Sequence, residues 1–181
     1  MKKTWLALAG LLTLWTTGGQ AQMTPSKTLI AYYSWSGNTR AVAEEIQKQT
    51  GGTLFEIQTV TPYPAAYQAT VDQAKKEIAD GYRPALVTPL PDVTGYDVVF
   101  VGSPNWWGTI APAVSSFLAA KNLSGKTVVP FITHGGGYVQ NTVKDLTAQC
   151  TGCQVAEAYV GYGTSSPDEK DIQEWLEKLS K

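Results

Sequence analysis

The sequence predicts an α/β fold with one parallel sheet and helices on both of its faces. Five apolar runs of strand length alternate along the chain with five runs whose apolar residues recur at helical spacing. Such alternation is typical of βαβ units, whose strands are parallel and buried on both sides. After its first 21 residues the chain keeps about 160 residues, which is enough for one domain with a full core.

The first 21 residues have the features of a secretory signal peptide. Met1-Lys2-Lys3 is a short basic start, and the apolar run from Leu6 to Leu14 is far shorter than the roughly 20 residues that a membrane span needs. Gly19-Gln20-Ala21 offers small residues for cleavage after Ala21. No cysteine stands at the cleavage site and no arginine pair precedes the apolar run. We therefore expect general secretory export to the bacterial periplasm or beyond, without a stable membrane anchor.

The remaining domain, residues 22–181, is mildly acidic. Loss of Lys2 and Lys3 lowers the basic residues from 14 to 12 against 15 acidic ones, which gives a net charge of −3. Nucleic-acid binding usually needs a basic face, so this balance argues against it. The chain contains no internal repeat, low-complexity tract or block of like charges that would indicate an array or a linker.

The first half of the domain contains two strand–helix pairs. Residues 29–33 are apolar and predict the first strand, and residues 39–50 predict a helix that ends at Gly51-Gly52. Residues 53–57 predict the second strand. Two prolines then interrupt the chain, and residues 65–80 predict a helix that ends before a glycine.

The second half repeats this alternation after an irregular connection that contains three prolines. Residues 96–102 predict a third strand, apolar enough to be buried on both faces. Residues 110–121 predict a helix with Pro112 in its first turn, where proline is tolerated. The remaining elements are a fourth strand over residues 126–133, a helix over 138–149, a fifth strand over 155–160 and a last helix from the start signal at Ser166-Pro167 to about residue 179.

The loop after the first predicted strand has the composition of a phosphate-binding loop. Hydroxyl and amide groups surround one glycine directly before a helix, where backbone N–H groups and the helix dipole favour an anion. The loop has no lysine, unlike a Walker loop, so it suits a cofactor monophosphate that stays bound. Ordinary helix capping is the alternative, although a cap needs only one of these polar residues. The expected binding residues are Ser34, Trp35, Ser36, Gly37, Asn38 and Thr39.

Two further loops should lie beside it, because ligands of open parallel sheets bind outside the carboxyl ends of the strands. The loop after the third strand contains adjacent indoles, which cannot both face a core, so at least one should be exposed or cover a ligand. The loop after the fourth strand offers backbone N–H groups from a run of glycines. The expected binding residues here are Pro104, Asn105, Trp106, Trp107 and Gly108, with Thr133, His134, Gly135 and Gly136.

His134 is the only histidine of the chain. A proton-donating role is one reading, but a lone histidine without an acidic or cysteine partner in sequence is more often a structural or binding residue. Metal ligation would need further ligands. We therefore expect His134 to bind and not to catalyse, and we expect neither a metal site nor a catalytic side chain.

The three loops together resemble those of flavodoxins. Residues 34–39 are similar to the flavodoxin phosphate loop, Thr/Ser-x-Thr/Ser-Gly-Asn-Thr. Pro-Asn-Trp-Trp-Gly at 104–108 and Thr-His-Gly-Gly-Gly at 133–137 resemble the flavin-ring loops of a flavodoxin-like branch common in bacterial genomes. The resemblance covers nearly all of the domain. It implies a doubly wound, flavodoxin-like sheet of five parallel strands in the order 2-1-3-4-5, with bound FMN whose ring lies against an indole.

Cys150 and Cys153 follow the helix of residues 138–149. The negative end of a helix dipole disfavours a thiolate, which weakens the case for a catalytic thiol. In an oxidising compartment a structural disulfide is the better interpretation, worth about 2 kcal/mol for so short a ring. Thiol catalysis is the alternative.

These features favour an exported, flavodoxin-like electron carrier that binds FMN and serves a redox partner protein. The first alternative is an FMN-dependent NAD(P)H or quinone oxidoreductase, which would need a second substrate site. The other alternative is a flavodoxin-fold binding protein without redox activity. Carriers of the family are typically acidic around the flavin, whereas the three loops of this chain contain no Asp or Glu. The nature of the partner, and whether the protein is an enzyme, therefore stay open.

Overall fold

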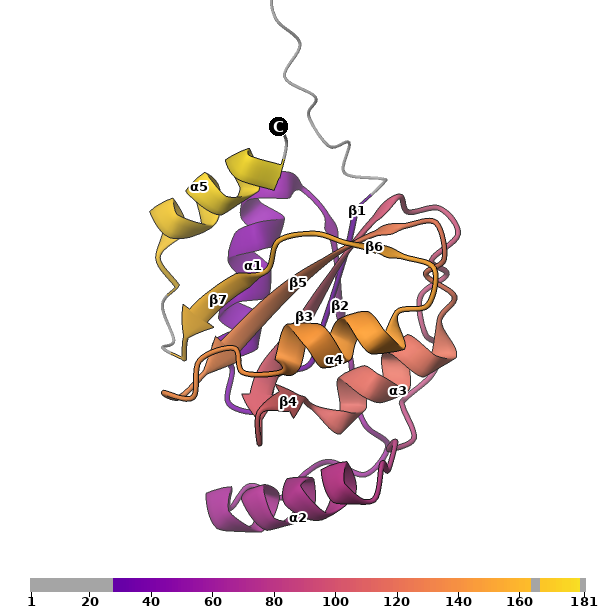
Figure 1. Ribbon diagram of the computed structural model, residues 1–181, viewed down its shortest axis with the longest axis vertical. Coiled ribbons are helices and arrows are strands. Elements are labelled where there is room, and N and C mark those ends of the chain that lie inside the picture. Colours follow the sequence, from indigo (N-terminus) through magenta and orange to yellow (C-terminus); the bar gives the residue numbers. More distant parts are fainter. Residues whose placement is uncertain (1–27, 164–166, 180–181) are drawn as a thin grey trace, which may run out of the picture.

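The computed structural model describes residues 28–163 and 167–179. The expected signal peptide, residues 1–21, lies outside these described residues, as does Ser166. A twisted parallel sheet forms the centre of the described part, and helices cover both of its faces (Figure 1). Within that part, no helix is both long and apolar enough to cross a membrane.

The sheet follows the predicted strand order. The main path is β2-β1-β3-β5-β6 with all neighbours parallel, and β7 pairs with β5 farther along the strand. β6 and β7 therefore share the fifth position, and the predicted order 2-1-3-4-5 is confirmed. The strands are β1 (Thr28–Tyr32), β2 (Thr53–Glu56), β3 (Val98–Trp106), β4 (Thr109–Ile110), β5 (Thr127–His134), β6 (Gln154–Val155) and β7 (Tyr159–Tyr162).

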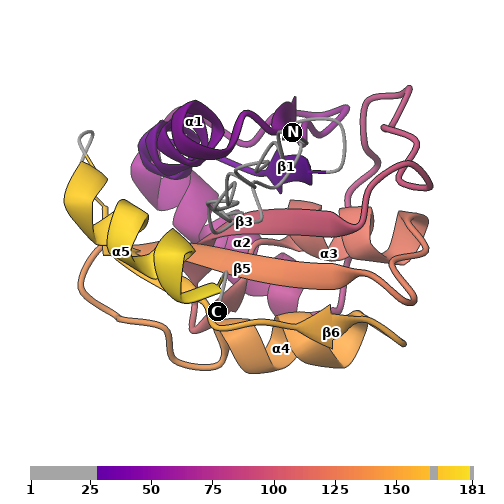
Figure 2. The same cartoon turned by 90° about the horizontal axis from the view of Figure 1, so that it is seen from above.

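Two apolar clusters attach the helices to the sheet. One joins helices α1 and α5 to side chains such as Phe100 and Phe131, and the other joins α3 and α4 to the opposite face through Phe117 and Leu146. Figure 2 shows α1 and α5 on one side of the strands and α3 and α4 on the other. The helices are α1 (Asn38–Thr50), α2 (Tyr67–Ala79), α3 (Pro112–Ala120), α4 (Thr142–Gln149) and α5 (Glu169–Leu179).

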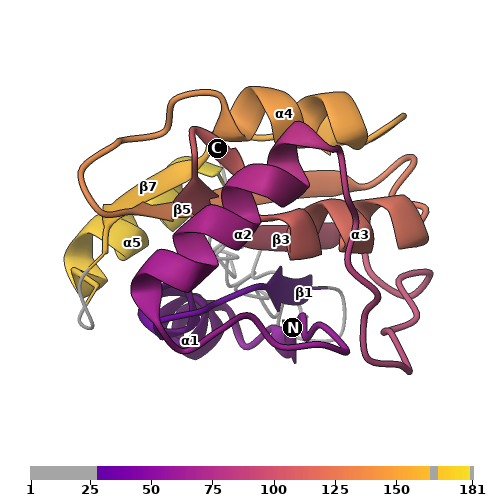
Figure 3. The same ribbon diagram turned by 90° about the horizontal axis from the view of Figure 1, so that it is seen from below.

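Helix α2 packs much less closely than the others. Only Thr70 and Ala74 of its 13 residues are buried. It lies beside α3, farther from the sheet than the other helices, and crosses the molecule obliquely (Figures 1 and 3). Its position leaves one flank facing the loops at the carboxyl ends of β1 and β3.

Three elements differ from the sequence predictions for identifiable reasons. β3 continues through residues 103–106, which were expected in a loop, and turns into the antiparallel strand β4 at Trp107-Gly108. Both turn residues have positive φ, 54° and 84°, as a two-residue type I′ hairpin requires. Helix α4 starts four residues later than expected, because Tyr138 and Gln140 also have positive φ and cannot continue a helix. The expected fifth strand is split into β6 and β7. Between them, the carbonyl of Glu157 accepts a hydrogen bond from the indole N–H of Trp175.

Gly102 lies at a point of the sheet that has no room for a side chain. A Cβ built there would lie 2.2 Å from Cζ of Phe131 and 2.8 Å from Cβ of Tyr32, so the strand and both neighbours would have to move. We predict that Gly102→Ala lowers the free energy of unfolding by about 1–3 kcal/mol through overpacking. Gly95→Ala, which meets no atom within 4 Å, is the matched control. Equal denaturation midpoints in urea for the two variants would contradict this reading.

Candidate functional site

The amino end of α1 forms an uncapped helix terminus that faces open space. The N–H of Gly37 donates to Oγ of Ser34 at 3.1 Å, and no side chain caps the helix. Among the described residues, none accepts a hydrogen bond from the N–H groups of Asn38, Thr39 and Arg40. A Cβ at Gly37, whose φ is 91°, would meet no atom within 4 Å. Free N–H groups at an open helix terminus are the usual setting for a bound anion.

The hydroxyl of Thr39 is used inside the protein. Thr39 is buried, and its Oγ1 lies 2.8 Å from Oγ1 of Thr133 in a hydrogen bond that joins the start of α1 to the end of β5. From the sequence, this hydroxyl was expected to face a ligand. In the structure the main-chain N–H of Thr39, which has no acceptor among the described residues, is the group that is free to bind one. Ser36, by contrast, is exposed at the open side of the loop.

Asn105 holds the loops after β3 and β5 together. Its amide Nδ2 donates to the carbonyl of Tyr138 at 2.5 Å, and its Oδ1 accepts from the N–H of Gly108 at 2.9 Å. The carbonyl of Gly108 in turn accepts from the N–H of Asn141 at 2.9 Å. Pro104, one residue earlier, pairs in register with Thr133 of β5. Two of the three predicted loops are therefore linked through one amide side chain.

The adjacent indoles point to different environments, as expected for a pair that cannot share one core. The ring of Trp106 is half-buried and meets Tyr33 and Tyr63 edge-on, with centroid distances of 5.5 Å and 4.9 Å. Trp107 is 54% exposed. Its indole N–H donates to the carbonyl of Val71 in α2 at 3.0 Å, and Nζ of Lys75 lies 4.9 Å from its ring centroid.

A cavity of about 310 Å³ separates α2 from the first two loops. Trp35 forms one wall, and its indole N–H donates to the carbonyl of Pro64 at 3.0 Å. The α2 wall could not be predicted from the sequence, because nothing in the helical pattern of residues 65–80 indicates which loop the helix faces. The lining residues are Trp35, Tyr67, Thr70, Val71, Ala74, Asn105, Trp106 and Trp107. A flat aromatic ligand fits such a lining.

His134 is enclosed by two tyrosines that the sequence analysis did not single out. The histidine is only 8% exposed, and its ring centroid lies 5.0 Å from that of Tyr138 and 5.5 Å from that of Tyr162. Its Nδ1 accepts from the N–H of Gly136 at 3.1 Å. Gly135 and Gly136 are exposed, and a Cβ at either would meet no atom within 4 Å. The glycine backbone, and not the imidazole, is thus the open part of this loop.

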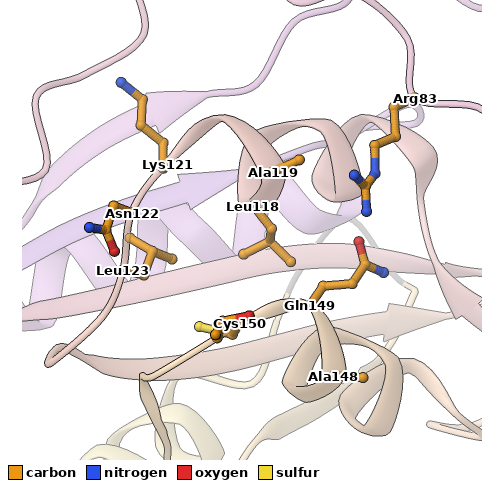
Figure 4. Close-up of a pocket in the computed structure, with 10 residues that line it drawn as sticks. Arg83, Leu118, Ala119, Lys121, Asn122, Leu123, Ala148, Gln149 and Cys150 are labelled. Atoms are coloured by element: carbon orange, nitrogen blue, oxygen red, sulfur yellow. The ribbon is translucent and has the colours of Figure 1, made fainter.

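The expected disulfide between Cys150 and Cys153 is present. It follows α4 and lies at the amino ends of β5 and β6, at the opposite edge of the sheet from the three loops. A cavity of about 410 Å³ adjoins it, with Arg83 and Gln149 at one end and Lys121 and Asn122 at the other (Figure 4). Among the described residues, no group of histidine, cysteine or acidic side chains could hold a metal ion.

Beneath the indoles, Tyr63 forms a close pair with a carboxylate. Its hydroxyl donates to Oε2 of Glu77 in α2 at 2.5 Å. Burial raises the pKa of Tyr63 above its ordinary value, and the hydrogen bond to Glu77 raises it further. Burial likewise raises the pKa of Tyr33, with smaller effects from the charges of Glu77 and Glu56. Both phenols therefore stay protonated well into the alkaline range.

Comparison with known proteins gives a consistent result over the whole domain. The family model described as Flavodoxin matches residues 27–179. A curated relative, NAD(P)H dehydrogenase (quinone) of Cupriavidus metallidurans, is 32% identical over 96 residues, a match that covers 51% of this chain. The match covers 45% of that relative, so this chain spans about half the length of the curated protein it matches.

Two solved structures are similar to nearly the full described chain. A protein of Bacteroides eggerthii assigned as a flavoprotein is 32% identical, with a TM-score of 0.76 and coverage of 86% of this chain and 99% of that one. A flavoprotein of Lactobacillus acidophilus, solved in complex with FMN, is 26% identical, with a TM-score of 0.68 and coverage of 83% and 99%. The similarity thus extends over the sheet and its helices and is not confined to one motif.

The raised pKa values predict how stability changes in alkali. A phenol whose pKa is higher in the folded state stabilises the fold fully below its unfolded pKa, about 10, and this contribution falls as the pH rises above that value. We predict that the free energy of unfolding of the wild type falls more steeply above about pH 10 than that of Tyr63→Phe. Urea titrations across this pH range measure both slopes, and parallel slopes would contradict the prediction.

Proposed function

Because the chain belongs to the flavodoxin family, we propose that it binds FMN at the carboxyl edge of its sheet and acts in electron transfer. The observation that carries this proposal is the uncapped amino end of α1. Three backbone N–H groups there have no acceptor among the described residues and border open space. Helices α1 to α4 all lack a side-chain cap, but α1 alone among them starts at a glycine of positive φ with open space around its Cβ position, where unpaired N–H groups can bind an anion.

The residues around this terminus fit a phosphate monoester and a flat ring. Ser34, Ser36 and the N–H groups of residues 38–40 supply neutral donors, and the helix dipole supplies the favourable potential. The cavity between Trp35 and Trp107 suits an aromatic ring system, and the exposed N–H of Gly135 offers a donor for a ring carbonyl. FMN, when bound, supplies one- and two-electron redox chemistry, and the chain fixes its place and surroundings.

A charge introduced at Ser36 tests the phosphate role. Two like charges about 4 Å apart at a protein surface repel by roughly 1–4 kcal/mol, so we predict that Ser36→Glu weakens FMN binding about tenfold or more. Riboflavin, which lacks the phosphate, should bind wild type and variant alike. Fluorescence quenching or titration calorimetry gives both affinities.

Thr151→Glu is the matched control, since Thr151 is an exposed hydroxyl residue at the opposite edge of the sheet. It should leave FMN binding unchanged. Equal losses for FMN and riboflavin in Ser36→Glu would place the phosphate elsewhere. Absence of FMN binding by the wild type would remove the redox proposal and favour a binding protein of the same fold.

An FMN-dependent NAD(P)H or quinone oxidoreductase is the second candidate. The partial match to NAD(P)H dehydrogenase (quinone) favours it, and this candidate needs room for a second flat substrate beside the ring of FMN. Stopped-flow mixing of FMN-loaded protein with NADH separates the two candidates. Fast, saturable loss of flavin absorbance supports a reductase, whereas slow reduction by NADH with fast exchange with a small redox protein supports a carrier.

We also propose that the protein is exported through its amino-terminal segment and then cleaved. On expression of the full chain in a Gram-negative host, the periplasmic fraction should contain protein whose intact mass corresponds to a chain starting at Gln22. Ala21→Leu, which removes the small residue before the cut, should retain the first 21 residues. A full-length mass confined to the cytoplasm would contradict export.

A further inference from the structure

Trp106 lies between the candidate site and a buried tyrosine. One side of the indole lines the cavity beside α2. On the other side its ring meets the ring of Tyr63 edge-on, at a centroid distance of 4.9 Å and an interplanar angle of 83°. Tyr63 is only 8% exposed. The two rings are therefore in van der Waals contact within the protein, with one of them at the site.

The phenol of Tyr63 has a proton acceptor already in place. Its hydroxyl donates to Oε2 of Glu77 at 2.5 Å, within the range in which a proton moves directly between heavy atoms. The second oxygen of Glu77 accepts from Nε2 of Gln73 at 2.8 Å, which fixes the carboxylate. Glu77 is half-buried and borders an open hollow of about 160 Å³, so a proton that reaches it can pass to solvent.

We propose that Trp106 and Tyr63 form a one-electron relay that carries an oxidising equivalent from the candidate site to the phenol of Tyr63, with Glu77 of α2 accepting the phenolic proton. The relay goes beyond the binding of a cofactor, because any one-electron oxidant that reaches Trp106 can start it. Its role is to move a damaging oxidation from the site to a buried phenol whose proton is held by Glu77.

The step balances in electrons, protons and charge. A freely diffusing oxygen-centred radical takes one electron from the indole of Trp106 and is reduced to its anion, and the indole becomes a radical cation. The phenol of Tyr63 then returns one electron to the indole and transfers its hydroxyl proton to the carboxylate of Glu77. Neutral Trp106, a neutral tyrosyl radical and a protonated Glu77 result, so the net charge of the three groups is unchanged.

The carboxylate distinguishes Tyr63 from the other tyrosines that contact an indole. Between ring centroids, Tyr33 lies 5.5 Å from Trp106, Tyr159 lies 5.4 Å from Trp175 and Tyr67 lies 6.2 Å from Trp35. Among the described residues, none of these three hydroxyls donates to a carboxylate. An oxidised phenol is a strong acid, so a base already hydrogen-bonded to its hydroxyl favours loss of the electron and the proton together at neutral pH. A purely structural role for Tyr63, as an anchor for α2, would not require this chemistry.

Pulse radiolysis of the purified protein without cofactor tests the relay directly. The azidyl radical is a one-electron oxidant that prefers indoles to phenols, and transient absorption then follows both radicals. In the wild type, indolyl absorbance should decay while tyrosyl absorbance grows with the same first-order rate, independent of protein concentration. The rate should fall in D₂O, because a proton moves in the same step. Because no FMN is present, the result does not depend on the proposed cofactor.

Four variants assign the path. Tyr63→Phe and Trp106→Phe should abolish the growth of tyrosyl absorbance, and the matched control Tyr33→Phe should leave it unchanged. Glu77→Gln keeps an acceptor for the hydrogen bond but not a base, and should abolish the growth at neutral pH with all rings in place, whether or not the other variants fold. Failure of the wild type to form a tyrosyl radical would overturn the proposal, as would growth that survives in Glu77→Gln.

Discussion

The parallel pairing of β3 with both of its neighbours is the constraint on which the site depends. β1 and β5 flank this strand in parallel register, so the loops after all three strands emerge at one edge of the sheet. Two side-chain contacts then fix the loops to one another, the Thr39–Thr133 hydroxyl pair and the Asn105 amide. A shift of β3 by one residue would separate these contacts and turn its core side chains to the other face.

The start of α1 leaves backbone N–H groups without acceptors among the described residues. Its carboxyl end is closed by Gly51, whose N–H donates to the carbonyl of Gln47, whereas its amino end has no side-chain cap although serine, asparagine and threonine all stand nearby. A cap there contributes about 1 kcal/mol, so the chain gives up that stability with the required side chains present. Helices α2, α3 and α4 also start without a side-chain cap, so α1 is set apart by the position of its free N–H groups at the edge where three loops converge.

The sequence predicted the strand order and the convergence of the three loops. Apolar periodicity and turn residues are local signals that locate the strands and loops, and parallel pairing then brings the loops after neighbouring strands to one edge of the sheet. The sequence did not predict features that depend on contacts between distant residues. The hairpin turn at Trp107 was not predicted, because its sequence lacks the Asn-Gly pair typical of such turns. The fifth strand is interrupted at Glu157, whose carbonyl accepts a hydrogen bond from the indole of Trp175. The buried bond of Thr39 and the enclosure of His134 likewise depend on partners from other elements. The assignment of the loops to a phosphate and a ring remains a prediction.

Two of the contacts that attach helix α2 to the domain involve aromatic side chains at or beside the site. Only two of its own side chains are buried. The indole N–H of Trp107 donates a hydrogen bond to the carbonyl of Val71, and the hydroxyl of Tyr63 donates one to the carboxylate of Glu77. A ligand that enters the cavity must contact the same indoles, so its binding and the position of α2 draw on one set of contacts.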